Sequence, residues 1–346
     1  MTTVVTTLPG TPTAPRREHD PVFGERIPET APQVPYRNVA ARRRAWDNLA
    51  NLTGFVNENS ESLTAQQMLK RGDLDWDVAL KPTYRYTGVG NDRRLIKAND
   101  LATVREDNDA QLGTVRKRYQ VFQNREVFAF GDNIAREGKG KWVATGLQRD
   151  GARVFMVMEL VDDFTVLGDQ HKMFIVFRTS HNGSSRLRAD LSPIRMNCFN
   201  QNALITKTAE ASWGITHALN HDLQEQEAQK AFGLAANYEH AYADLAAKLN
   251  SIEMTPDRAT KILTVSMDKR AKVATVIRDA HVNWLSSPTI NEAQRMTGWG
   301  LLNGVTEYMD HVIRRDNAAA TFEATMNGEG ARVRNRLVTN MLRLAA

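Results

Sequence analysis

Two dipeptides that favour tight turns, each flanked by alternating apolar and polar residues, are the features that most constrain the fold of this chain. Asp150-Gly151 lies within residues 142–160, and Asn182-Gly183 lies within residues 173–194. Asp-Gly and Asn-Gly favour a type I′ turn, because both central residues of that turn need a positive φ. Apolar and polar residues that alternate on both sides of such a turn pair as antiparallel strands. The sequence therefore predicts two β-hairpins, and Pro193 marks the exit of the second.

Shorter elements are predicted before the hairpins. Residues 62–71 predict a helix that begins after Ser62 or Thr64 and stops at Gly72. A second helix should begin at Asn124, where apolar residues recur at helical spacing as far as Ile134. Strands are predicted by alternation or composition at 75–80, 84–89, 94–97 and 115–122.

The last part of the chain has helical periodicity. Residues 218–249 are rich in Ala, Leu, Gln and Glu, and Thr255-Pro256 is an N-cap followed by proline at the first helical position. Further helices are predicted at 258–267, 271–284, 291–315 and 331–344. We predict an α+β fold, in which a central β-hairpin sheet with a packed helix is followed by a helical C-terminal region.

Proline content suggests how the chain is divided. Seven of the eleven prolines lie in residues 1–35, which contain few large apolar side chains. Such a composition does not fill a core, so we expect a disordered, proline-rich arm there. Residues 36–205 then form a predicted α+β nucleic-acid-binding core, and residues 206–346 form the helical region.

Positive charge is concentrated in the middle of the chain. Residues 111–200 contain 14 Lys and Arg against 9 Asp and Glu, whereas the segments on either side are each neutral. Basic side chains neutralise phosphates and supply the sequence-independent part of nucleic-acid affinity. On the second hairpin, Arg186 and Arg188 alternate with apolar residues, which gives that strand a cationic side. The predicted DNA-binding residues are Arg116, Lys117, Arg118, Arg125, Lys139, Lys141, Arg149, Arg153, Lys172, Arg178, Arg186, Arg188 and Arg195.

Motifs for nucleotide chemistry and for covalent catalysis are incomplete. Residues 138–142 lack the spacing and the Ser or Thr of a phosphate loop, and residues 88–90 lack the third glycine of a dinucleotide fingerprint. The serines beside His181 lie on a tight turn, where neighbours rarely point at one another as a triad requires. We expect no cofactor and no catalytic residue.

Metal chemistry is weakly indicated. The run of aspartates from Asp73 to Asp77 lacks the later ligands of a calcium loop, and His217 with His221 makes an incomplete zinc site. Cys198 is the only cysteine, so a disulfide within the chain is excluded. One metal hypothesis stays open, a magnesium-dependent nuclease that uses Glu159, Asp162 and Asp163.

Hydropathy predicts a cytoplasmic protein without a membrane partner. No apolar run approaches the 18 residues of a membrane helix. The first twenty residues lack the apolar centre of a secretory signal.

Several motifs together resemble a known family. They are Leu112-Gly113-Thr114-Val115, Gln123-Asn124-Arg125-Glu126, Thr179-Ser180-His181-Asn182-Gly183-Ser184-Ser185, Pro193-Ile194-Arg195 and the run from Gly298 to His311. Over roughly residues 40–316 the chain resembles the phage and plasmid proteins of domain-of-unknown-function family 932. The resemblance implies an origin in a phage or another mobile element and a setting in DNA metabolism. In outline the pattern is also similar to ATP-independent annealing proteins of the Rad52 and Redβ kind, so a Rad52-like core is a possible form of the fold.

These observations favour a phage protein that binds single-stranded DNA and anneals complementary strands without ATP. We expect it to form a homo-oligomeric ring or filament in the host cytoplasm. A phage exonuclease and a host single-strand-binding protein are candidate partners. Two alternatives stay open: the metal-dependent nuclease or another nucleic-acid enzyme, and a structural or host-interaction protein in which the charge is incidental.

Overall fold

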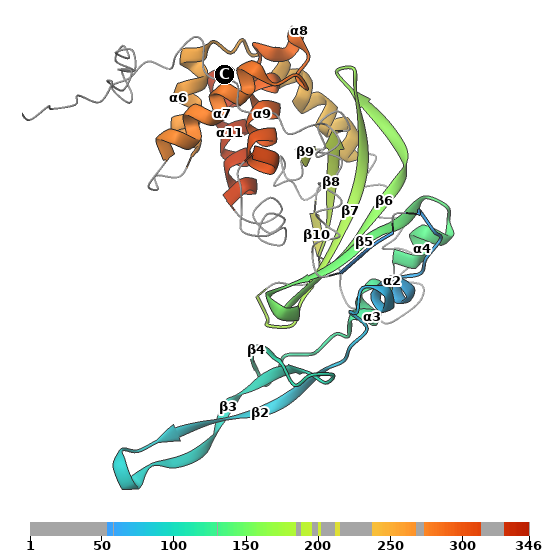
Figure 1. Cartoon of the computed structure of the whole chain (residues 1–346), viewed down its shortest axis with the longest axis vertical. Coiled ribbons are helices and arrows are strands. Elements are labelled where there is room, and N and C mark those ends of the chain that lie inside the picture. Colours follow the sequence, from blue (N-terminus) through green and yellow to red (C-terminus); the bar gives the residue numbers. More distant parts are fainter. Residues whose placement is uncertain are drawn as a thin grey trace, which may run out of the picture.

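The structure is a computed structural model that describes residues 54–57, 59–129, 131–184, 188–195, 200–201, 212–214, 237–267, 273–312 and 329–345. The mixed α+β fold is confirmed, because two antiparallel sheets precede a helical C-terminal region. Figure 1 shows the helical region at one end, the larger sheet in the middle and a long two-stranded arm at the other end. Within these residues no helix is long and apolar enough to cross a bilayer. Several predictions fall outside the described residues: those for the proline-rich segment 1–35, for Cys198, and for His217 and His221.

The larger sheet is a four-stranded meander with short strands at its edges. The two predicted hairpins are confirmed, and a turn at Leu167-Gly168, which the sequence analysis did not identify, joins them. The meander consists of β5 (Gly140–Gln148), β6 (Arg153–Val166), β7 (Asp169–Ser180) and β8 (Arg188–Arg195). The added strands are β1 (Gly54–Val56) against β5, and β9 (Asn200–Gln201) and β10 (Ser212–Gly214) against β8.

One face of the meander forms a hydrophobic core. Trp142, Met158 and Phe177 are fully buried there, and the Trp142 and Phe177 rings meet edge-on with centroids 5.3 Å apart. The indole N–H of Trp142 donates to Asp132 Oδ1 at 2.8 Å. This face is covered by α2 (Ala65–Arg71), α3 (Asn124–Phe128) and α4 (Gly131–Arg136). Sheet and helices therefore share a single core.

Local sequence signals set the bounds of α2, whereas tertiary contacts change α3. Thr64 and Gln67 form a capping box at the start of α2, and Gly72 ends it, as predicted. The helix predicted over 124–134 is instead divided into α3 and α4, and its N-cap is Gln123. Asn124 does not cap because its amide donates to the Leu74 carbonyl oxygen at 2.9 Å.

The smaller sheet carries the projecting arm. It consists of β2 (Val78–Thr87), β3 (Arg94–Arg105) and β4 (Gln111–Arg116), with the short 3₁₀ helix η1 (Gly90–Asp92) at the arm tip. The strands predicted at 75–80 and 84–89 are one continuous strand with an irregularity between Pro82 and Tyr84. The strand predicted over 115–122 ends at Arg116, where the chain turns. Beyond β4 the arm is only two strands wide.

The C-terminal region is a packed group of helices. Residues 237–250 are helical, and Thr255 caps the next helix with Pro256 at its first position, as predicted. The helix predicted over 291–315 is interrupted, and Thr297 caps a new helix after the break. The remaining elements are α6 (Pro256–Ser266), α7 (Val273–Ser286), α8 (Glu292–Arg295), α9 (Gly298–Glu307), the π-helical turn η3 (Tyr308–Val312) and α11 (Glu329–Ala345).

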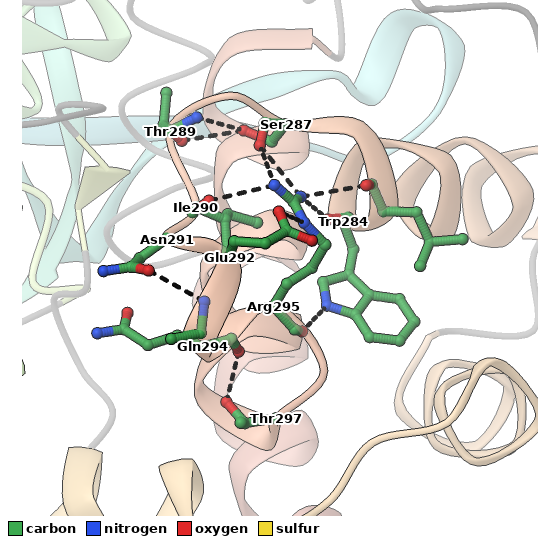
Figure 2. Close-up of polar contacts among 11 residues, drawn as sticks. Trp284, Ser287, Thr289, Ile290, Asn291, Glu292, Gln294, Arg295 and Thr297 are labelled. Atoms are coloured by element: carbon green, nitrogen blue, oxygen red, sulfur yellow. Dashed lines mark hydrogen bonds and ion pairs between the residues drawn. The ribbon is translucent and has the colours of Figure 1, made fainter.

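Arg295 holds the connection between α7 and α9 in place. Figure 2 shows its guanidinium among carbonyl groups of the last turn of α7 and of the residues that follow it. Helix ends leave such carbonyls without intrahelical partners, and a cation also complements the negative end of the helix dipole. The indole of Trp284 returns a hydrogen bond to the Arg295 carbonyl oxygen at 2.6 Å. The acceptors of the guanidinium are the carbonyl oxygens of Trp284, Leu285, Ser287 and Ile290 and the carboxylate of Glu292, at 2.8–3.2 Å.

We predict that Arg295→Gln lowers the free energy of unfolding by about 2–4 kcal/mol, because a shorter amide leaves several partly buried carbonyls unpaired. Urea denaturation followed by circular dichroism measures the change. Lys261→Gln is the matched control, since Lys261 is an exposed cation on α6; it should change the value by less than about 0.5 kcal/mol. Equal effects of the two variants would contradict the role of Arg295.

Candidate nucleic-acid interface

Nearly half of the predicted DNA-binding residues are in ion pairs with nearby carboxylates. A paired cation offers less to a phosphate, because the phosphate must compete with the acid already present. The pairs with their N–O distances are Arg125–Asp77 at 2.5 Å, Lys139–Glu137 at 2.8 Å, Lys141–Glu159 at 3.6 Å, Lys172–Glu159 at 2.6 Å, Arg188–Asp190 at 3.6 Å, and Arg178–Asp190.

The Arg178 and Asp190 pair is part of the interior of the sheet. The Asp190 side chain is fully buried, and the Arg178 side chain is 14% exposed. Arg188 lies directly across from Arg178 in the ladder between β7 and β8 and makes a second ion pair with Asp190. Two arginines thus compensate the charge of one buried carboxylate, and this pairing leaves less of their positive charge available to a phosphate.

Two of the three carboxylates of the nuclease hypothesis, Glu159 and Asp163, lie close to a lysine. Lys172 donates to Glu159 and lies 3.7 Å from Asp163, and the hydrogen bond that Glu159 accepts raises the pKa of Lys172. Burial raises the pKa of Glu239, and the negative charge of Asp162 adds to the rise. No three His, Cys, Asp or Glu side chains gather to hold a metal within the part of the chain that the structure describes. The nuclease hypothesis stays a prediction.

Two predicted residues lie at the turn between β5 and β6. Arg149 has a φ of 52° at this turn, and Arg153 begins β6. The guanidinium of Arg153 donates to the Ser184 hydroxyl at 3.3 Å, which joins the tips of the two hairpins. Arg186 and the side chain of Arg195 lie outside the described residues.

The three remaining predicted residues, Arg116, Lys117 and Arg118, lie together and are exposed. They occupy the end of β4 and the turn that follows it. Among the described residues their side chains have no ion pair and no side-chain hydrogen bond. The structure therefore divides the predicted set into paired cations, on the larger sheet and on the segment from α3 to β5, and a free group at the base of the arm.

A junction of buried polar and aromatic groups connects the two sheets. Trp76 packs edge-on against His181, with ring centroids 5.4 Å apart, and the guanidinium of Arg105 lies 4.3 Å from the Trp76 ring centre. The Tyr119 hydroxyl donates to the Ser180 carbonyl oxygen at 3.0 Å. This contact explains why the strand predicted through residue 122 ends early: the chain must turn to bring Tyr119 to β7.

Close backbone approach completes the junction. A Cβ atom on Gly113 would lie 2.7 Å from the Cα atom of Asn182, so only glycine lets β4 pack on the turn after β7. Gly183 has a φ of 71°, in the left-handed region, but Asn182 does not have a positive φ, so the chain reverses here without the type I′ turn that the dipeptide favours. The Asn182-Gly183 turn therefore positions β4 as well as reversing the chain.

His181 is held neutral in this junction. Its Nε2 atom lies 2.9 Å from Asn124 Oδ1, and since the Asn124 amide nitrogen donates to the Leu74 carbonyl oxygen, that Oδ1 atom accepts from the imidazole. Burial lowers the pKa of His181 to about 4. The unfolded chain, with a histidine pKa near 6.5, binds the proton more tightly, so acid favours unfolding.

We predict that stability falls as the pH drops below about 6.5 and that His181→Gln weakens this dependence. Between pH 7.5 and pH 5 the wild-type protein should lose about 2 kcal/mol more than the variant, from the pKa difference. Urea titrations at the two pH values measure the difference. His240→Gln, at an exposed histidine, is the control and should behave as wild type. An unchanged pH dependence in His181→Gln would contradict the prediction.

A further cationic surface lies on the arm and was missed by the sequence analysis. Residues 81–101 contain five Lys and Arg against two Asp. This local excess is not visible in the count over residues 1–110, because acidic residues elsewhere in that segment balance it. Arg85, Arg94 and Lys97 are exposed and have no ion pair among the described residues. A shorter counting window would have found this signal. In Figure 1 the arm extends away from the larger sheet, so its strands are open to a partner.

Comparison with known proteins identifies the family. The family model described as domain of unknown function (DUF932) matches residues 111–340. This chain belongs to the DUF932 family. The match begins at the first residue of β4, so it includes both hairpins and the Asn182-Gly183 turn, while the β2–β3 arm precedes it. No curated protein and no solved structure matches the chain.

Proposed function

We propose that this DUF932 protein binds single-stranded DNA and promotes the annealing of complementary strands, as a phage or mobile-element recombinase that needs no ATP. The supporting observation is a group of exposed side chains, here named the free cations, with no acidic partner among the described residues. They are Arg85, Arg94, Lys97, Arg116, Lys117 and Arg118. A phosphate backbone can bind these side chains without first breaking an ion pair.

The position of the free cations suits a strand that runs along the smaller sheet. Arg116 lies directly across from Asp100 on β3, and β3 continues from there to Lys97 on one face of the ribbon and Arg94 on the other. Contacts to the phosphates carry no sequence information, so they leave the base edges available for pairing. Several copies bound along one strand would present it to its complement, which is why we also propose a homo-oligomer.

The free cations at β4 give the first test. We predict that the triple variant Arg116→Gln, Lys117→Gln, Arg118→Gln weakens binding to single-stranded DNA. The slope of log K against log salt should fall by about 2, because each phosphate that a cation no longer neutralises reduces it by roughly 0.7. Filter binding to an oligothymidine between 50 and 300 mM salt measures the slope. A fluorescence-quenching assay with complementary oligonucleotides measures annealing, which should slow in parallel.

The matched control removes three exposed cations from the helical region. Lys248→Gln, Lys261→Gln and Arg343→Gln take away the same net charge at a distance from the arm, so the salt slope should stay at the wild-type value. Equal losses in the two triple variants would show that net charge alone attracts DNA. Undetectable wild-type binding at low salt would overturn the proposed function.

A further inference from the structure

The outer part of the arm has two regular faces. Within β2 and β3, Tyr84 lies directly across from Lys97, and Tyr86 lies directly across from Leu95. Because side chains alternate along a strand, these four residues share one face. The opposite face carries Arg85 and Arg94, which pair with Ile96 and Thr87. We name the first of these the tyrosine face.

The tyrosine face is exposed to an unusual degree for its composition. Tyr84 is 55% exposed, Tyr86 is 62% exposed and Leu95 is 55% exposed. A two-stranded ribbon has no core of its own and is marginally stable by itself. Large exposed aromatic groups grouped together mark an interaction surface, because water is a poor solvent for them. The face therefore needs a partner that can cover flat rings.

Charge on the tyrosine face identifies the kind of partner. Lys97 lies beside Tyr84 across the ladder, and the guanidinium of Arg93 lies 4.2 Å from the centre of the Tyr86 ring. Each exposed ring thus has a cation next to it. A second copy of the arm would place these cations against one another, whereas a nucleic-acid strand supplies both flat bases and phosphates.

The spacing of the two rings favours an unpaired strand. Residues two apart on a β-strand are separated by about 6.6–6.8 Å. Stacked bases rise by only about 3.4 Å per nucleotide, so one base can lie on each ring only where the strand is extended and unstacked. A duplex keeps its bases stacked and paired, and it cannot make this contact. Stacking occupies the flat face of a base and leaves the hydrogen-bonding edge free.

We propose that the tyrosine face of the β2–β3 arm stacks unpaired bases on Tyr84 and Tyr86 while Arg93 and Lys97 bind the adjacent phosphates, and that this contact makes the protein prefer single strands to duplexes. The inference rests on the proposed function for its ligand class. It adds the contact that distinguishes one form of DNA from the other, which the free cations by themselves do not.

The test compares two double variants at the same positions. Tyr84→Ala with Tyr86→Ala removes both rings, and Tyr84→Phe with Tyr86→Phe keeps them. Affinity for a 15-nucleotide oligothymidine and for a 15-base-pair duplex is measured at one salt concentration. The alanine variant should bind the single strand about tenfold or more weakly and the duplex as the wild type does, whereas the phenylalanine variant should retain both affinities.

A second readout locates the contact directly. Photocrosslinking of a 5-iodouracil-substituted oligonucleotide, followed by peptide mass spectrometry, should place the crosslink at Tyr84 or Tyr86. Val89→Ala at the arm tip is the control, because Val89 is 90% exposed but offers no ring; its affinity should equal that of the wild type.

The possible results separate this inference from the proposed function. If the alanine variant binds oligothymidine like the wild type while the triple variant at Arg116, Lys117 and Arg118 does not, the stacking contact is wrong and the proposed function stands. If the wild type binds no single strand, both fail. If the alanine variant loses single-strand and duplex affinity equally, or changes the mass of the DNA-free assembly, the tyrosine face does not select single strands by stacking.

Discussion

Burial of one face of the β5–β8 meander positions the described helices that pack against it. Trp142 and Phe177 pack edge-on in this core, and Asp132 on α4 accepts the indole hydrogen. At the far end of the β6–β7 hairpin, Gln294 donates to the Leu167 carbonyl oxygen, and Tyr242 packs on His171. Both groups of helices therefore pack against the same four strands, one group near each end of the β6–β7 hairpin (Figure 1).

The charge of the meander serves a different purpose from the charge of the arm. On a compact sheet, cations and carboxylates of neighbouring strands come within reach of one another, and burial makes an unpaired charge costly. Accordingly, Asp190 forms ion pairs with two arginines, and Glu159 forms ion pairs with two lysines. The outer arm is surrounded by solvent, so its cations need no such partners. Both regions contain many cations, but those of the meander are mostly in ion pairs within the protein, whereas those of the outer arm are open to a ligand.

The junction at His181 connects these two regions. Trp76 at the base of the arm packs on His181, and β4 lies against the Asn182-Gly183 turn without room for a side chain at Gly113. The DUF932 match includes this turn but begins only at β4. Within the junction His181 is neutral and hydrogen-bonded to Asn124, and its protonation would place a buried charge there without an acidic partner.

The sequence by itself determined the elements whose signals are local. The hairpin turns, the capping box at Thr64 and the Thr255-Pro256 helix start depend on backbone conformations that a few adjacent residues dictate. Charge counting identified the basic segment 111–200, which includes Arg116–Arg118. It could not distinguish paired cations from free ones. It also did not detect the cations of the arm, because residues 1–110 are neutral overall. Pairing depends on which strands become neighbours, as with Arg178 and Asp190, and exposure depends on how far β2 and β3 extend beyond β4. Both are long-range properties, so only the tertiary structure decided them.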